Sequence, residues 1–163
     1  MNAFRKAEKK DVPTLRMLAV RSEGVWGFDE RFLRTFDEQY NITEQFIENN
    51  PAFVLEEHGE IMGFWGIVRQ KDIAELEYLY VDAAQIRKGI GRALWDHMVR
   101  YCSLEGIKRI EFVTSEPAID FYLKNGARLN GNTRSSIDGR EIPRLYYELE
   151  GQVNFLPLTG RRN

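Results

Sequence analysis

The sequence predicts a single domain of the mixed α/β class, formed by residues 1–150 and followed by a C-terminal tail at 151–163. Three observations predict it. The chain has 163 residues, a length at which one domain holds a core of its own. Hydrophobic residues make up 43% and charged residues 29%, as in ordinary globular proteins. The hydrophobic spacing gives the order β-α-α-β-β-β-α-β-α-β-β, an antiparallel meander that leads into a β-α-β unit.

The N-terminal part reads as a short strand followed by two helices. The strand is expected at residues 4–7. Asp11 stands where it would cap a helix that has Pro13 in its first turn and runs to about Val20. A second helical stretch is expected over residues 31–49, because its aromatic and aliphatic residues recur at helical spacing, and Thr43 is expected as a cap within it.

Three consecutive strands are predicted next. Residues 52–57 and 61–70 flank a tight turn that contains glycine, which indicates a hairpin, and 73–81 follow as a third strand. Alternation along the third strand predicts two faces. One face would carry Leu76, Tyr78 and Tyr80, and the other Glu75, Glu77, Leu79 and Val81.

The C-terminal half returns to alternating helices and strands. A helix is expected over 91–105, and Gly106 is placed to end it. Residues 109–114 read as a short buried strand. The stretch 117–126 opens with proline and closes with glycine, as a short helix does. Two more strands, joined by a polar loop, are expected in 127–150.

Composition restricts the classes of function. A net charge of −2 argues against a nucleic-acid-binding surface, and no apolar run is long enough to span a membrane. Neither a nucleic acid nor a membrane is therefore expected as a partner. The single cysteine, Cys102, cannot form an intrachain disulfide, which favours a cytoplasmic protein. His58 and His97 stand far apart and lack ligand spacing, so no metal site is expected.

A glycine loop between the third strand and the next helix carries the clearest chemical signal. Gly89 and Gly91 leave backbone N–H groups accessible at the start of the helix. Arg87, Lys88 and Arg92 add positive charge to the partial charge of the helix end. Such a loop predicts a phosphate or diphosphate ligand. Neither a dinucleotide-binding GxGxxG motif nor a P-loop motif fits the spacing.

Two stretches together resemble a known family. Residues 76–99 read LEYLYVDAAQIRKGIGRALWDHMV, and residues 118–127 read AIDFYLKNGA. At this separation, and with this order of elements, the chain is similar to the GNAT superfamily of acetyl-CoA-dependent N-acyltransferases. One departure is Ile86, which stands where the family's first motif has arginine or glutamine.

The resemblance implies a binding mode for acetyl-CoA as cosubstrate. The backbone of the strand at Leu79, Tyr80 and Val81 would pair with the pantetheine arm, as a peptide pairs with a strand edge. The diphosphate would be held by Arg87, Lys88, Gly89, Ile90, Gly91 and Arg92.

The resemblance also implies catalytic roles. Glu75 and Glu77 are the candidate bases for the acceptor amine, and neither is preferred over the other. Tyr122 would donate a proton to the departing thiolate. The alternatives are solvated strand carboxylates and a packing tyrosine. Between the first two helices, the acceptor pocket would be walled by Trp26, Gly27 and Phe28.

The function expected from these residues is an N-acetyltransferase that moves an acetyl group to a primary amine of a small molecule by direct attack. One alternative is a CoA-binding sensor or structural protein of the same fold. A second is a protein acetyltransferase that acts on lysine or an N-terminus. The resemblance leaves a homodimer open, since the family often dimerises and the chain shows no interface signal.

Overall fold

Seven strands form one mixed sheet in the computed structural model, which describes residues 2–86 and 88–149. Their order across the sheet is β1-β2-β3-β4-β5-β7-β6. The order of elements along the chain confirms the predicted fold class. The predicted tail, 151–163, lies outside the described residues.

The N-terminal part contains more helical segments than the sequence predicts. They are β1 (Asn2–Lys6), η1 (Lys9–Asp11), α1 (Val12–Val25), α2 (Glu30–Thr35), η2 (Phe36–Tyr40) and α3 (Glu44–Asn49). The helix expected to end near Val20 continues to Val25. The helical stretch expected over 31–49 is interrupted at Asn41, whose backbone is extended and whose side chain donates to the carbonyl oxygen of Arg16 in α1, at 3.0 Å. The predicted cap at Thr43 is confirmed, because its hydroxyl accepts from the backbone N–H of Phe46 at the start of α3.

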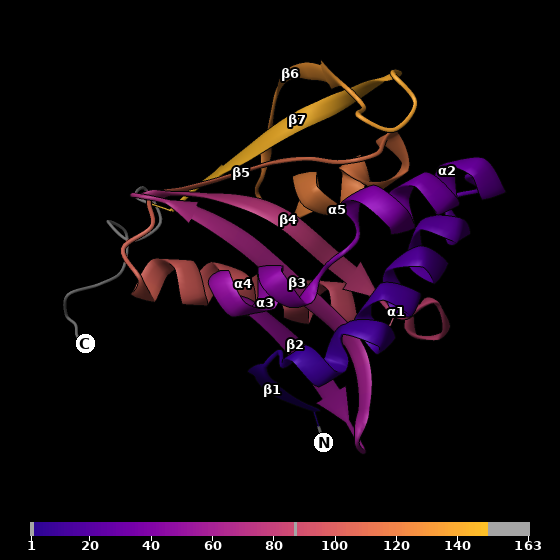
Figure 1. Ribbon diagram of the computed structural model, residues 1–163. Helices are drawn as coiled ribbons and strands as arrows, with labels where there is room; N and C mark the ends of the chain where they lie inside the picture. The colour runs from indigo at the N-terminus through magenta and orange to yellow at the C-terminus, as the bar shows by residue number, and fades with distance from the viewer. Residues whose placement is uncertain (1, 87, 150–163) are drawn as a thin grey trace.

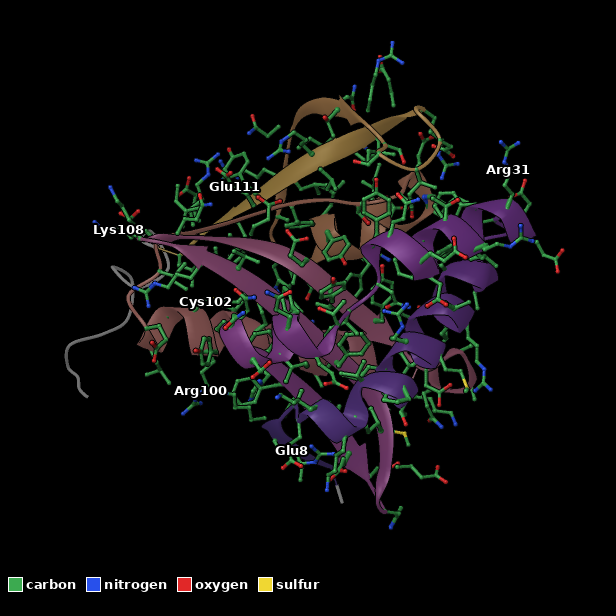
Figure 2. The ribbon with its side chains drawn as sticks, viewed as in Figure 1. Glu8, Arg31, Arg100, Cys102, Lys108 and Glu111 are labelled. Carbon is green, nitrogen blue, oxygen red and sulfur yellow. The ribbon has the colours of Figure 1, made fainter. Side chains whose placement is uncertain are left out.

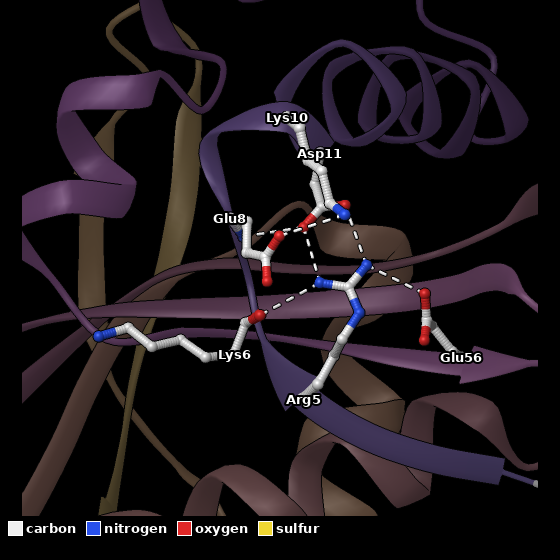
Figure 3. A network of polar contacts seen from close by, with 6 residues as sticks. All are labelled: Arg5, Lys6, Glu8, Lys10, Asp11 and Glu56. Atoms are coloured by element: carbon white, nitrogen blue, oxygen red, sulfur yellow. Dashed lines mark hydrogen bonds and ion pairs between the residues drawn. The ribbon is translucent and has the colours of Figure 1, made fainter.

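Asp11 occupies the predicted N-cap position of α1, but its carboxylate forms no capping hydrogen bond with this helix, because it is engaged elsewhere (Figure 3). It accepts two hydrogen bonds from the Arg5 guanidinium, at 2.8 and 2.9 Å, and one from the backbone N–H of Glu8, at 2.8 Å. Arg5 also donates to Glu56 at 3.0 Å. This network ties β1 both to the turn that precedes α1 and to the neighbouring strand, so it fixes where α1 begins.

The rest of the chain follows the predicted order closely. Its elements are β2 (Ala52–Glu57), β3 (Glu60–Gln70), β4 (Ile73–Val81), η3 (Ala83–Gln85), α4 (Ile90–Leu104), β5 (Arg109–Val113), η4 (Glu116–Ala118), α5 (Ile119–Lys124), β6 (Arg128–Arg134) and β7 (Glu141–Glu148). The hairpin of β2 and β3 is confirmed, with His58 and Gly59 in its turn at positive φ.

Two hydrophobic clusters pack on opposite faces of the sheet. Phe64 belongs to the cluster that contains α1 and α3, whereas Trp65, the next residue in β3, belongs to the cluster that contains α4. Successive strand residues point to opposite faces, so the two clusters lie on the two sides of β3. Helices therefore cover both faces of this part of the sheet.

A β-bulge in β4 makes the predicted alternation wrong. Ile67 pairs with Leu76 and Gly66 pairs with Tyr78, so Glu77 is an extra residue without a partner of its own. The bulge reverses the faces of all later residues. As a result, the cluster with α4 receives Ala74, Leu76, Leu79 and Val81, whereas the cluster with α1 receives Tyr78 and Tyr80.

The two central strands separate along their length. β4 and β5 are parallel and pair only at Ile73–Glu75 and Arg109–Glu111. Figure 1 shows the strands diverging beyond these residues, with β5, β6 and β7 forming one arm and β4 the edge of the other. Among the described residues, the edge of Leu76–Val81 that faces β5 therefore has no strand partner.

Candidate active site

A cavity of about 900 Å³ lies where β4 and β5 diverge. Its walls come from the C-terminal turn of α1, from β4, from the start of α4, from α5 and from the loop between β6 and β7. These segments are far apart in the sequence. The separation of the strands thus creates a space that side chains from the whole chain can reach.

Most of the predicted site residues meet in this cavity. Gly27, Lys88 and Ile90 are not among its lining residues, and Ile90 is buried in the cluster with α4. Arg87 lies outside the described residues. The predicted residues that do line it are Trp26, Phe28, Glu75, Glu77, Leu79, Tyr80, Val81, Gly89, Gly91, Arg92 and Tyr122.

The glycine loop presents open backbone at the beginning of α4. Gly89 has φ +81°, which glycine adopts without strain, and a Cβ built there would meet no atom within 4 Å. Gly91 lies in the first turn, where a Cβ would come within 3.2 Å of the Phe121 ring. The loop therefore leaves space beside N–H groups of the helix end, a space that a side chain would fill. This arrangement fits the diphosphate of coenzyme A.

The free edge of β4 fits the other part of coenzyme A. Leu76–Val81 have backbone groups along the side that faces away from β3, and no strand pairs with them there. The pantetheine arm carries two amide groups and can pair with such an edge as an extended peptide does. Both sites belong to one cavity, so a single extended ligand can occupy both.

Two carboxylates stand beside the bulge of β4. Glu75 is half-buried, and its pKa is raised first by burial and then by the negative charge of Glu77, while Arg144 opposes the shift. Burial also raises the pKa of Glu77, although its side chain lies more exposed than that of Glu75. A carboxylate with a raised pKa holds a proton more readily than usual.

Tyr122 is buried at the inner end of the cavity. Its ring lies 4.6 Å from the ring of Phe112 and 5.7 Å from that of Trp95, between centroids. Burial, and next the negative charge of Glu23, raise the pKa of its hydroxyl. No hydrogen bond to this hydroxyl is formed within the described part of the chain, so it remains available to a ligand.

A further carboxylate, Glu23, which was not predicted from the sequence, belongs to the same cavity. Glu23, in the last turns of α1, accepts a hydrogen bond of 2.7 Å from the Tyr80 hydroxyl through Oε2. Burial is the main cause that raises the pKa values of both groups. A signal for Glu23 exists, because Leu15, Ala19 and Glu23 recur every four residues along the buried side of α1.

Aromatic rings form the outer wall beside Glu23. The ring of Phe28 stacks on that of Phe32, with centroids 4.1 Å apart. The guanidinium carbon of Arg140, from the loop before β7, lies 4.5 Å from the centroid of the Phe28 ring. Trp26 also lines the cavity and is 44% exposed. The contact of Arg140 with Phe28 joins the loop between β6 and β7 to the segment between α1 and α2.

Within residues 2–86 and 88–149, no group of three or more His, Cys, Asp or Glu side chains is arranged to hold a metal ion. Cys102 is buried on α4 (Figure 2), and burial raises the pKa of its thiol to about 12. No helix in the described part of the chain has the length and apolar character needed to cross a membrane.

Comparison with solved structures finds the same fold in acetyltransferases. PaiA N-acetyltransferase of Thermoplasma acidophilum, solved with coenzyme A, superposes with a TM-score of 0.78 at 18% identity, over 91% of this chain and 99% of its own. The ribosomal-protein-S18-alanine N-acetyltransferase of Escherichia coli gives 0.70 at 21% identity, over 91% and 94%. The IAA acetyltransferase of Bacillus cereus gives 0.65 at 17%, over 91% and 99%.

Comparison of the sequence itself identifies the family. No curated protein sequence matched the chain. The model of the acetyltransferase (GNAT) family matches residues 14–127, which extend from α1 through the glycine loop to the end of α5. Enzymes of this family act on small-molecule or protein substrates. The chain belongs to the GNAT acetyltransferase family, and acetyl-CoA is its cosubstrate.

Proposed function

We propose that the protein is an N-acetyltransferase that transfers the acetyl group of acetyl-CoA directly to a primary amine of a small molecule. The observation that carries the proposal is the cavity between β4 and β5. It joins an open glycine loop, a free strand edge, carboxylates with raised pKa values and the Tyr122 hydroxyl. We further propose that the enzyme is cytoplasmic, since its one cysteine is buried and unpaired.

Acetyl-CoA supplies a thioester whose carbonyl carbon can be attacked by a neutral amine. The nitrogen–carbon bond forms and the carbon–sulfur bond breaks, and its electron pair stays on sulfur. Tyr122 gives its proton to that sulfur and regains one from the amine through solvent. An ammonium substrate and acetyl-CoA thus yield an acetamide, free coenzyme A and one proton. The oxyanion would be held by a backbone N–H of β4 near Leu79 or Tyr80.

Glu75 and Glu77 remain the candidate bases that make the amine neutral. An ammonium with a pKa near 10 is almost fully charged at neutral pH, so a base is useful. The raised pKa values of both carboxylates support this role, because a base works best when its pKa is near the working pH. Their charges also repel one another, which is a further cause of the raised pKa of Glu75.

The shape of the acceptor side favours a small molecule over an extended peptide. Arg140 lies across Phe28, and the Tyr40 hydroxyl donates to the carbonyl oxygen of Ser136, at 3.3 Å. Both contacts join the loop between β6 and β7 to the helices on the other side of the cavity. They restrict the opening through which a peptide would have to run.

Calorimetric titration of acetyl-CoA and of free coenzyme A tests the cosubstrate site, and we expect micromolar binding of both. A panel of primary amines, with the released thiol detected, then tests transfer. Absence of binding would refute the proposal. Binding without thiol release on any amine or lysine peptide would favour the CoA-binding sensor. Release on peptides alone would favour the protein acetyltransferase.

A further inference from the structure

The hydrogen-bonded pair of Glu23 and Tyr80 lines the cavity, and neither side chain takes part in the proposed acetyl transfer. Tyr80 donates to Oε2 of Glu23 at 2.7 Å, so the carboxylate is fixed in orientation. The other oxygen, Oε1, has no hydrogen-bond or ion-pair partner within residues 2–86 and 88–149. A half-buried carboxylate that is oriented on one side and open on the other can accept hydrogen bonds from a ligand.

The position of the pair differs from that of the two carboxylates of β4. Glu75 precedes Tyr80 by five residues with the bulge in between, and their partners in β3, Val68 and Phe64, are four residues apart, which a strand spans in about 13 Å. Glu23 meets Tyr80 side chain to side chain instead. Among the described residues, Glu23 is the carboxylate whose negative charge contributes to the raised pKa of Tyr122. Both residues line the cavity.

The surroundings of Glu23 are aromatic. The ring of Phe36 meets that of Tyr80 edge to face, with centroids 6.0 Å apart, and Trp26 and Phe28 line the same cavity. Arg140 is the positive charge that acts on Glu23, where it opposes the rise in the pKa of the carboxylate; it lies over Phe28, and its Nε is 3.4 Å from Asp138 Oδ2. A carboxylate among ring faces suits a cation, because both the negative charge and the π faces attract it.

We propose that Glu23, held in place by Tyr80, binds the ammonium group of the acceptor through Oε1, and that the acceptor is a primary amine carried on an apolar or aromatic body. The inference rests on the proposed function and names the substrate class of the same cavity. Glu23 thereby holds the nitrogen in the cavity that Tyr122, Glu75 and Glu77 also line. The rings beside it hold the body of the molecule, and an acceptor lacking a positive charge is bound poorly.

Binding to the protein saturated with free coenzyme A tests this without any turnover. The probes are 2-phenylethylamine and 2-phenylethanol, which differ in the charged group alone. We expect wild-type protein to prefer the amine by at least ~10-fold, as one charge-assisted hydrogen bond of about 1.5–3 kcal/mol provides. Glu23→Gln should abolish this preference, and Tyr80→Phe should reduce it, because the carboxylate then loses its orientation.

Glu30→Gln is the matched control, since it removes the same charge from the exposed start of α2, outside the lining of the cavity. It should keep the preference of the wild type. In steady-state kinetics, Glu23→Gln should raise KM for the amine at least ~10-fold. The KM for acetyl-CoA and the melting temperature should stay as in wild type, which a merely structural role would not produce.

The outcomes separate this inference from the proposed function. If acetyl-CoA binds and amines are acetylated while Glu23→Gln keeps the wild-type preference, the inference alone is overturned. The same holds if the wild-type complex binds the alcohol as well as the amine, or neither of them. If acetyl-CoA does not bind at all, the proposed function is overturned, and the inference that rests on it is overturned with it.

Discussion

Replacement of Gly89 by valine is the sharpest test of the cosubstrate site, because the chain offers a matched control. Gly89 and Gly59 both have φ +81°, and at both a Cβ would meet no atom within 4 Å. Gly89 lies at the start of α4 in the cavity, whereas Gly59 lies in the turn between β2 and β3. The two substitutions therefore introduce the same backbone strain at two places, and only one of them is the proposed phosphate site.

The strain can be given a magnitude. A residue with a side chain in the left-handed region costs about 1–2 kcal/mol, and a β-branched one lies at the upper end. For a domain of this size, that lowers the melting temperature by about 2–8 °C, in Gly59→Val and Gly89→Val alike. In Gly89→Val, the added methyl groups also occupy the space beside the N–H groups. Loss of one hydrogen bond to a charged phosphate, about 1.5–3 kcal/mol, weakens binding by about 10- to 150-fold.

Calorimetric titration of acetyl-CoA, with thermal melting of each variant, measures both effects. We expect similar melting temperatures for the two variants and a loss of affinity in Gly89→Val alone. Wild-type affinity in Gly89→Val would refute the placement of the diphosphate at this loop. An equal loss of affinity in both variants would show that strain, and not the site, is responsible.

Three further predictions concern catalysis and stability. Tyr122→Phe should lower kcat by about 10²-fold and leave acetyl-CoA affinity unchanged, because the ring contacts remain; an unchanged kcat would make Tyr122 a packing residue. A base must be deprotonated to act, so kcat/KM should rise with pH through a pKa above the usual carboxyl value. The variant that abolishes this rise, Glu75→Gln or Glu77→Gln, identifies the base. If the rise persists in both variants, neither residue is the base. Asp11→Asn should lower the free energy of unfolding by about 2 kcal/mol at neutral pH, measured by urea titration. Since hydrogen bonds from Arg5 lower the pKa of Asp11, this difference is complete above the unfolded-state pKa and disappears as pH falls through the folded-state pKa; a difference independent of pH would contradict it.

Local sequence patterns were sufficient to predict the structure wherever it is decided by residues close together in the sequence. The hairpin of β2 and β3 follows from two apolar runs around a glycine turn, and the end of α4 follows from Gly106. The glycine loop could be recognised in the same way, because N–H groups at a helix start and nearby cationic residues are all set by a short stretch of chain. Thr43 marked the start of α3 in the sequence, but the break at Asn41 could not be recognised, because the Asn41 side chain bonds to Arg16 in a different helix.

The features that make a site out of these elements depend on pairing across the chain. Glu77 becomes a bulge only because β3 pairs with β4 in one particular register, and this register turns Tyr80 toward α1. The Tyr80 hydroxyl then meets Glu23, 57 residues earlier in the sequence. A periodic pattern reports which side of an element is buried, whereas the identity of the neighbour is set by how the elements pack. The sequence alone therefore determined most of the elements and the glycine loop, and the tertiary structure decided which carboxylates share the cavity with Tyr122.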